Sequence, residues 1–370
     1  MQTFWDSMPV IMLNRYLATF APGFESVIGG ILSETAPAAR MEATQSGMIL
    51  FSLAGNPAAA VNAPVFNNVF LVVRDWKKHD MTFPAMVNTI VRSDSLARIA
   101  AFVRSFRHKS FRVRFSKENQ FVSVDKKLVE SAERHIASVT GMLPDRVNPA
   151  CEFWFIIRRE AFSCFSFRLT KKQSTEKYLR QGELRPELVQ LIVALSAPGP
   201  EDSVFADPFA GYGSIPSRIL ANRKGQACTV YVSDSDPRRV ADLQSRFSGS
   251  PGVVVRKADA RDLSFIADAS VHRIITDPPW GEWEQSSPGS GGLARLYEGM
   301  LDSFARILAP GGRVCVLSSA KREMEEAVAK NPVFGTCAVT PGFRTDILVN
   351  GKKSAVFALY KAQEYTNETH

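Results

Sequence analysis

The chain has 370 residues, of which 45% are hydrophobic and 22% charged, so it is long enough for more than one hydrophobic core. No apolar run reaches the ~18 residues that a membrane-spanning helix needs, and the first residues lack the basic and small-residue features of a signal peptide. Five scattered cysteines, with no C-x-x-C pair or His/Cys cluster, predict reduced thiols in a cytoplasmic protein and argue against a disulfide framework or a zinc site.

The net charge of +8 lies in the first half of the chain. Residues 1–184 contain 24 lysines and arginines against 16 aspartates and glutamates, whereas residues 185–370 contain 21 of each. The surplus is densest at residues 92–117 and 158–180. This division predicts that the first half binds a polyanion while the second does something else, although a solvated basic face would give the same count.

The first half shows mixed strand and helix patterns. Residues 111–115 alternate strictly between apolar residues and arginine, which predicts a half-buried strand with Arg112 and Arg114 on its wet face. Residues 126–139 predict an amphipathic helix that ends at Gly141. Further strands are expected at 16–19, 48–51, 69–73, 152–157 and 161–169, and further helices at 24–33, 83–90 and 95–106. This half is therefore expected to be α+β with antiparallel pairing.

The second half alternates regularly between strands and helices. Residues 171–183 are polar and basic, and we interpret them as an interdomain linker. Pro186 then stands where a helix through Leu195 would begin. Strands are expected at 204–207, 228–233, 253–257, 271–276, 313–317 and 354–360. The alternation predicts an α/β domain with a doubly wound sheet.

A glycine turn follows the first of these strands. Asp207 ends the strand, and Gly211 and Gly213 allow a tight turn that a ligand can approach closely. The turn lacks the third glycine of a dinucleotide fingerprint and the G-K-[ST] of a phosphate-binding loop. A carboxylate at this position suits a cation, such as the amino group of an amino acid, and would repel pyrophosphate.

Three further acids follow the next three strands. Asp234 lies about 20 residues past the turn, where an acid can hold both hydroxyls of a ribose. Asp259 is placed to accept from an adenine amino group, and Asp277 ends the fourth strand. Each acid alone is more simply explained as a helix cap or turn former. The four together, in this order, predict a pocket for adenosine joined to an amino acid.

The fourth acid opens the segment Thr276-Asp277-Pro278-Pro279-Trp280-Gly281. The prolines stiffen the backbone and remove two donors, which leaves nearby carbonyls free to accept from a substrate amine. The face of Trp280 can stack a heteroaromatic base. A rigid corner between strand and loop is the plainer explanation of this segment alone. With the pocket upstream, the pattern predicts methylation of a planar exocyclic amine.

These motifs resemble the class I S-adenosylmethionine-dependent methyltransferases that modify exocyclic amines. The resemblance rests on D-P-F-x-G-x-G-[ST] at 207–214, on [ND]-P-P-[YFW]-G at 277–281, on their order, and on L-A-P-G-G-R at 308–313. Tyr212, between the glycines, and Trp280, in place of the commoner tyrosine, depart from the usual pattern. The implied cofactor is S-adenosylmethionine. The residues that the resemblance assigns to it are Asp207, Phe209, Gly211, Gly213, Asp234, Asp259, Ala260 and Asp277.

More narrowly, the chain resembles the THUMP-containing guanine-N2 methyltransferases of tRNA. This looser likeness rests on residues 16–25, the strand at 111–115, Asn148-Pro149 and the L-R-P-E-L at 184–188. It implies a ferredoxin-like module at 1–75, a THUMP-like RNA-binding domain at 76–170, the linker at 171–183, a Rossmann-like methyltransferase domain with a seven-stranded, mostly parallel sheet at 184–362, and a polar tail at 363–370.

The resemblance implies methylation of the N2 amine of a guanosine in tRNA. Asp277, Pro278 and Trp280 would be catalytic, and Arg112 and Arg114 would contact RNA phosphates unless they only keep a strand edge soluble. The alternatives are an amine methyltransferase of ribosomal RNA or DNA, an RNA-binding protein with a degenerate methyltransferase domain, and a nucleotide-dependent oxidoreductase. The modified position, the number of methyl groups added and a small activating subunit are left open. Residues 282–292 form a lid or a long surface loop.

Overall fold

The computed structural model describes residues 14–170, 180, 182–280, 292–340, 342–349 and 351–362. Most of the predicted linker, nearly all of the segment 282–292 and the tail at 363–370 lie outside the described residues. The chain forms two compact units, residues 1–20 with 28–173 and residues 21–27 with 174–370. Among the described helices, none is long and apolar enough to cross a membrane.

A single sheet organises the N-terminal unit. Its strand β4 (Asn68–Trp76) pairs with β1 (Asn14–Thr19) on one side and with β9 (Ser163–Arg168) on the other. The order is β2-β3-β1-β4-β9-β8-β5-β6, with β7 beside β5. The other strands are β2 (Arg40–Gln45), β3 (Met48–Leu53), β5 (Ser110–Lys117), β6 (Gln120–Phe121), β7 (Leu143–Pro144) and β8 (Cys151–Ile157). The sheet thus continues through both segments that the sequence assigns to separate modules.

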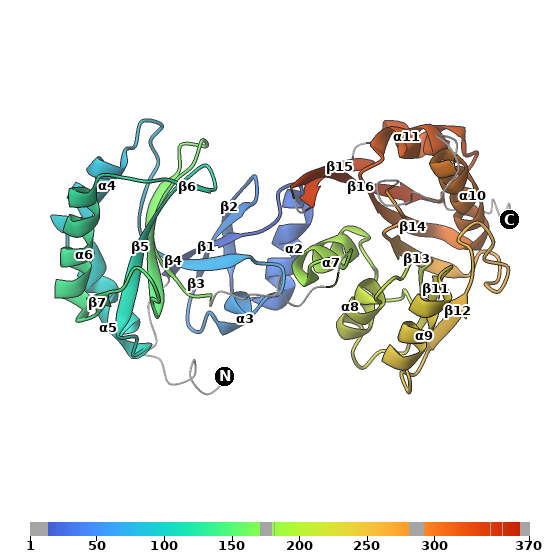
Figure 1. Ribbon diagram of the computed structural model, residues 1–370, viewed down its shortest axis with the longest axis horizontal. Coiled ribbons are helices and arrows are strands. Elements are labelled where there is room, and N and C mark those ends of the chain that lie inside the picture. Colours follow the sequence, from blue (N-terminus) through green and yellow to red (C-terminus); the bar gives the residue numbers. More distant parts are fainter. Residues whose placement is uncertain are drawn as a thin grey trace, which may run out of the picture. The chain divides into compact units, whose positions relative to one another are not determined.

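Three helices cover one face of this sheet around β5 (Figure 1). They are α4 (Phe83–Val91), α5 (Ser95–Ser105) and α6 (Lys126–Thr140); the unit also contains α3 (Ala58–Val61) and most of α2 (Glu25–Thr35). As predicted, α6 ends at Gly141, which has a left-handed φ of 78°. Alternate strand residues bury their rings beneath the helices, namely Phe111, Phe153, Phe155, Phe165 and Phe167. The α+β prediction is confirmed at this level.

The C-terminal unit has the predicted seven-stranded, mostly parallel sheet. Its order is β12-β11-β10-β13-β14-β16-β15, and the first five strands run parallel. The parallel strands are β10 (Val204–Asp207), β11 (Thr229–Asp234), β12 (Val253–Lys257), β13 (Val271–Thr276) and β14 (Leu308–Ser318). The strands β15 (Arg344–Val349) and β16 (Lys352–Tyr360) pair antiparallel at one edge.

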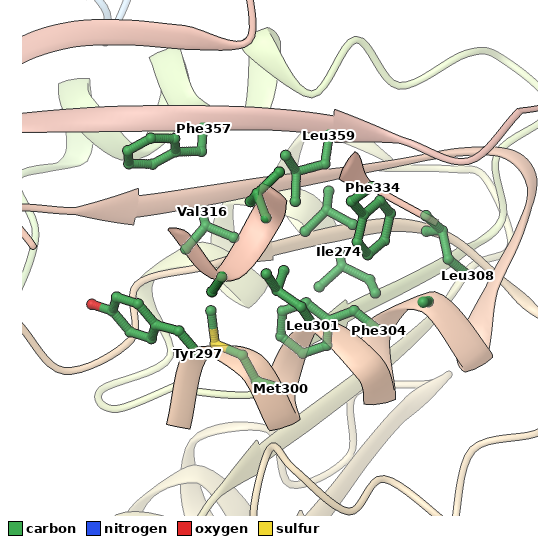
Figure 2. Packing of buried hydrophobic residues seen from close by; sticks show 14 of the residues in the cluster. Ile274, Tyr297, Met300, Leu301, Phe304, Leu308, Val316, Phe334, Phe357 and Leu359 are labelled. Carbon is green, nitrogen blue, oxygen red and sulfur yellow. The ribbon is translucent and has the colours of Figure 1, made fainter. Parts of the chain in front are cut away.

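Helices alternate with these strands, and a large apolar cluster holds two of them against the sheet. The helices are α7 (Pro186–Leu195), α8 (Ser214–Asn222), α9 (Pro237–Arg246), α10 (Gly292–Ile307) and α11 (Lys321–Lys330). Figure 2 shows side chains of α10, such as Met300 and Phe304, facing those of the strands, such as Ile274 and Phe357. All four are fully buried. This packing fixes α10 along β13, with its early residue Tyr297 near the carboxyl end of that strand.

Four strands were not predicted from the sequence, namely β2, β15 and the two-residue strands β6 and β7. Every residue of β2 is exposed or half-buried, so no apolar alternation marks it. The strand β15 lies at the edge of its sheet and exposes Leu348, which also breaks the pattern. The fifth parallel strand was expected at 313–317, but β14 begins at Leu308, whose partner in β13 is Val271. Pairing with a neighbour extends this strand through a segment that looked like a turn.

Candidate functional site

The strand order brings the four predicted acids to one edge of the C-terminal sheet. Asp207 ends β10, and Asp234 ends the neighbouring strand β11. Asp259 follows β12 beyond it, while Asp277 follows β13 on the other side of β10. The spatial order is therefore Asp259, Asp234, Asp207, Asp277, which differs from the order along the chain. Ligands of open α/β sheets bind where the strand order reverses, and here that point lies between β10 and β13.

The glycine turn after β10 is shaped for close approach by a ligand. Gly211 and Gly213 have φ values of 50° and 79°, which side chains rarely adopt. A Cβ on Gly213 would lie 2.9 Å from Cε2 of Phe247, so this glycine permits tight packing on α9. A Cβ on Gly211 would find its nearest atom, the Phe209 carbonyl oxygen, only at 4.0 Å. The backbone at Gly211 thus has open space beside it.

Tyr212 lies between these glycines, and its ring is covered by arginines. The guanidinium of Arg239 is 3.9 Å from the ring centroid, and that of Arg180 is 5.0 Å away. Arg246 donates to the Tyr212 carbonyl at 2.7 Å. These contacts brace the outside of the turn, so Tyr212 is part of the turn's packing and is not free to stack a base.

Asp234 is held against the same turn. Its Oδ2 accepts from the N–H of Gly211 at 3.0 Å, and its Oδ1 accepts from the N–H of Asp236 at 2.9 Å. Asp236 in turn caps α9 by accepting from Arg238 N–H. The carboxylate of Asp234 therefore joins the glycine turn to the loop before α9. It lies where the sequence predicted the residue that binds the ribose hydroxyls.

Asp207 is buried and is held by a residue that the sequence analysis missed. Its Oδ1 accepts from the Thr276 hydroxyl at 2.8 Å and from the N–H of Phe209 at 3.3 Å, while the same N–H also reaches the Thr276 oxygen at 3.2 Å. Burial raises the pKa of Asp207 to about 7, although these two donors oppose the rise. A buried carboxylate of this kind gains most from a cationic partner.

Asp277 begins the loop after β13 and is a second buried carboxyl with a raised pKa. Burial raises this pKa to about 8, and the charge of Asp207 adds to the rise. Trp280 opposes it, because the indole Nε1–H donates to Asp277 Oδ1 at 2.9 Å. Among the described residues, none donates to Oδ2 of Asp277 or to the carbonyl of Pro278. Within the described part of the chain, both acceptors are therefore left without a hydrogen-bond donor.

The next carbonyl along the loop is already bonded. The hydroxyl of Tyr297, in α10, donates to the carbonyl of Pro279 at 2.9 Å and lies 2.8 Å from the hydroxyl of Ser318. Neither residue was predicted from the sequence, because no local motif connects α10 or the end of β14 to the loop. Of the residues that were not predicted, only Thr276 lies within a recognised motif, directly before Asp277, so its contact with Asp207 could have been sought there.

Asp259 and Ala260 lie at the far end of the acidic edge. Ala260 is buried, as a wall of a ring-binding pocket would be. The carboxylate of Asp259 accepts from the guanidinium of Arg261 at 2.9 and 2.6 Å, and these bonds lower its pKa. The sequence predicted that this carboxylate would accept from an adenine amino group. In the structure it is already paired with Arg261, so an adenine would have to share the carboxylate with that arginine.

Arg112 and Arg114 are less exposed than the sequence predicted. They share a face of β5, but both approach Glu152, at 2.5 Å and 3.6 Å respectively, and Arg168 binds the same carboxylate at 2.9 Å. Burial would raise the pKa of Glu152, yet hydrogen bonds from Arg112, Trp154 and Arg168 hold it at about 2. The "wet face" is corrected to a half-buried cluster in which three guanidinium groups surround one carboxylate. It retains two positive charges.

Comparisons with known proteins address the C-terminal unit and the whole fold separately. Residues 174–341 match the sequence model described as UPF0020: RMKL-like, methyltransferase domain. Residues 174–341 form a methyltransferase domain. The fold of the chain is similar to that of TrmN from Thermus thermophilus, with 23% identity, a TM-score of 0.73 and coverage of 94% of this chain and 99% of TrmN. No curated protein sequence matches at a significant level.

A second solved structure concerns the cofactor. The chain resembles SMU.472, complexed with SAH, at 14% identity and a TM-score of 0.65, with 96% of this chain and all of the other covered. The residues of the methyltransferase domain fit such a group: open space beside Gly211, a carboxylate on the turn, and a buried acid that favours a cation. The cofactor of the methyltransferase domain is S-adenosylmethionine.

Proposed function

We propose that this protein methylates the exocyclic N2 amine of a guanosine in tRNA. The observation that carries the proposal is the division of acceptors in the loop after β13. Trp280 and Tyr297 donate to Oδ1 of Asp277 and to the Pro279 carbonyl, whereas no described residue donates to Oδ2 of Asp277 or to the Pro278 carbonyl, and we assign these two acceptors to the ligand. Two acceptors match the two N–H groups of a primary amine. The tRNA and guanine assignments both rest on the motif resemblance, and the likeness in fold to TrmN supports the tRNA assignment alone.

The chain's own residues position and deprotonate the amine. S-adenosylmethionine, when bound, supplies an electrophilic methyl group on a positively charged sulfur. Asp277 Oδ2 and the Pro278 carbonyl accept hydrogen bonds from the two N–H groups of the amine. These bonds localise on nitrogen the lone pair that the ring would otherwise delocalise. Trp280 stacks the extruded base. As the nitrogen becomes positively charged, its proton moves to Oδ2 of Asp277, so no separate strong base is needed.

The cofactor is held by the other residues of the acidic edge. Asp207 would bind the ammonium group, because a cation relieves the cost of ionising a buried carboxyl. Asp234, on the turn with Phe209, Gly211 and Gly213, would bind the ribose hydroxyls. Asp259 and Ala260 would contact the adenine, with Asp259 shared between the ring and Arg261.

RNA binding is assigned to the basic N-terminal unit. The surplus of eight positive charges in residues 1–184 favours a polyanion. The cluster of Arg112, Arg114 and Arg168 around Glu152 keeps two positive charges and is the proposed phosphate contact. In this proposal residues 1–75 act as a ferredoxin-like module, residues 76–170 as a THUMP-like domain and residues 184–362 as the catalytic domain of a cytoplasmic enzyme. A small activating subunit stays compatible with it.

The test is transfer of labelled methyl from S-adenosylmethionine to unmodified bulk tRNA, followed by nucleoside digestion and mass spectrometry. N2-methylguanosine is the expected product. Label in another nucleoside would overturn the guanine assignment, and preference for ribosomal RNA or duplex DNA would overturn the tRNA assignment. Asp277→Ala should abolish transfer while cofactor still binds, and full activity in that variant would refute the role of Asp277. Binding of RNA without binding of S-adenosylmethionine would favour a degenerate enzyme.

A further inference from the structure

Three hydrogen bonds connect the start of α11 to the loop after β13. The N–H of Ala320 donates to the Ser318 oxygen at 3.0 Å. The Ser318 hydroxyl lies 2.8 Å from that of Tyr297, which lies 2.9 Å from the Pro279 carbonyl. Burial raises the pKa of Tyr297 above its ordinary value, so the phenol keeps its proton. Because a carbonyl can only accept, Tyr297 donates to Pro279 and Ser318 donates to Tyr297.

The ring of Tyr297 cannot easily move. It is fully buried in the apolar cluster of the C-terminal unit, next to Met300 and Leu301 on the same helix. Figure 2 shows its hydroxyl oxygen pointing away from this cluster, so the polar end alone leaves the core. Ser318 is also fully buried and ends β14. The donor that reaches Pro279 is therefore fixed by the core of the domain.

The bond to this carbonyl has a specific geometric effect. The ring of Pro279 already restricts φ, and the direction of the carbonyl is set by ψ. Holding the carbonyl therefore fixes the remaining soft dihedral of Pro279, and with it the direction in which the chain reaches Trp280. The position of Trp280 decides whether its indole N–H meets Oδ1 of Asp277 at 2.9 Å.

We propose that Tyr297 and Ser318 form a positioning clamp for the amine-binding loop. Neither side chain touches the substrate in this proposal. The clamp fixes Pro279, which places Trp280, which orients Asp277 so that Oδ2 is presented to the amine. It also takes the Pro279 carbonyl out of competition with the Pro278 carbonyl as an acceptor. The inference rests on the proposed function, since it assigns the loop to amine recognition.

The experiment compares Tyr297→Phe, Ser318→Ala and the double variant with wild type, using the full chain. Tyr360→Phe is the matched control, because this tyrosine lies on the same unit with its side chain exposed. A misplaced reacting group costs up to about 100-fold in rate, so Tyr297→Phe should lower kcat by about 10- to 100-fold, with the KM for tRNA and the Kd for cofactor within about twofold of wild type. The double variant should be no slower than Tyr297→Phe, because Ser318 acts through Tyr297.

A second readout needs no catalysis. In protein labelled with 5-fluorotryptophan, the ¹⁹F resonance of Trp280, assigned by its loss in Trp280→Phe, should shift or broaden in Tyr297→Phe and stay in place in Tyr360→Phe. If Tyr297→Phe leaves the Trp280 resonance unchanged, or lowers the melting temperature while kcat stays normal, Tyr297 has only a structural role. If wild type transfers no methyl group, the proposed function fails and this resonance alone decides whether the clamp exists. If Tyr297→Phe does not fold, the resonance and kcat of Ser318→Ala decide in the same way.

Discussion

Replacing Asp207 by asparagine should stabilise the protein at alkaline pH while removing its cofactor. The asparagine oxygen can still accept from Thr276 and from the N–H of Phe209, so the packing and hydrogen bonds are kept. What disappears is a carboxyl whose pKa rises from 3.8 to about 7 on burial. Without bound ligand, the folded protein therefore prefers this group protonated.

The sign and size of the effect follow from proton linkage. Between pH 4 and pH 7 the folded state binds more protons than the unfolded state, so stability falls as the pH rises through this window. The shift of roughly three units, at about 1.4 kcal/mol each, amounts to about 4 kcal/mol as an upper value above pH 7. Asp207→Asn escapes this loss. It should match wild type near pH 4 and exceed it by up to about 4 kcal/mol at pH 8.

The assay is urea unfolding without cofactor at several pH values, together with the thermal shift that S-adenosylmethionine produces. On unfolding near pH 6, wild type should release about one proton more than the variant, because Asp207 contributes one proton in wild type only and the contribution of Asp277 is common to both. The variant should also lose the thermal shift. Glu201→Gln, which removes an exposed carboxyl of the same unit, is the control. Parallel stability curves for wild type and Asp207→Asn would refute the reasoning, because Asp207 would then be ionised in both states.

Three further predictions concern the neighbouring loops and the basic cluster. Trp280→Phe keeps an aromatic face but removes the N–H that lowers the pKa of Asp277, so the rising limb of the pH–rate profile should move to higher pH. A limb at the same pH would contradict the hydrogen bond from Trp280 to Asp277. Gly213→Ala forces a Cβ to 2.9 Å from a ring carbon at a left-handed φ, so it should cost at least about 1–2 kcal/mol in urea unfolding and weaken cofactor binding, whereas unchanged values would refute the close packing. Arg112→Ala and Arg114→Ala should each reduce the slope of log K against log salt for tRNA by about 0.7–0.9, and an unchanged slope would remove the residue from the phosphate contacts.

The local chemistry of this protein was visible in its sequence. Strands of the C-terminal half are short apolar runs bounded by turn residues, and the acids and glycines follow them directly, so periodicity and spacing were enough to find them. The strictly alternating strand at residues 111–115 was found for the same reason. The strand β2 was missed because it buries none of its residues, and only pairing with β3 defines it.

The tertiary structure decided what these residues do to one another. Strand order sets Asp277 beside Asp207, although Asp234 and Asp259 lie between them in the chain, and burial at that edge raises both pKa values. Contacts between distant segments bring Tyr297 to Pro279, and bring three arginines to Glu152. A sequence pattern records the local backbone and the side-chain type. Burial, pairing and hydrogen-bond partners depend on packing between segments far apart in the chain, and no spacing rule specifies them.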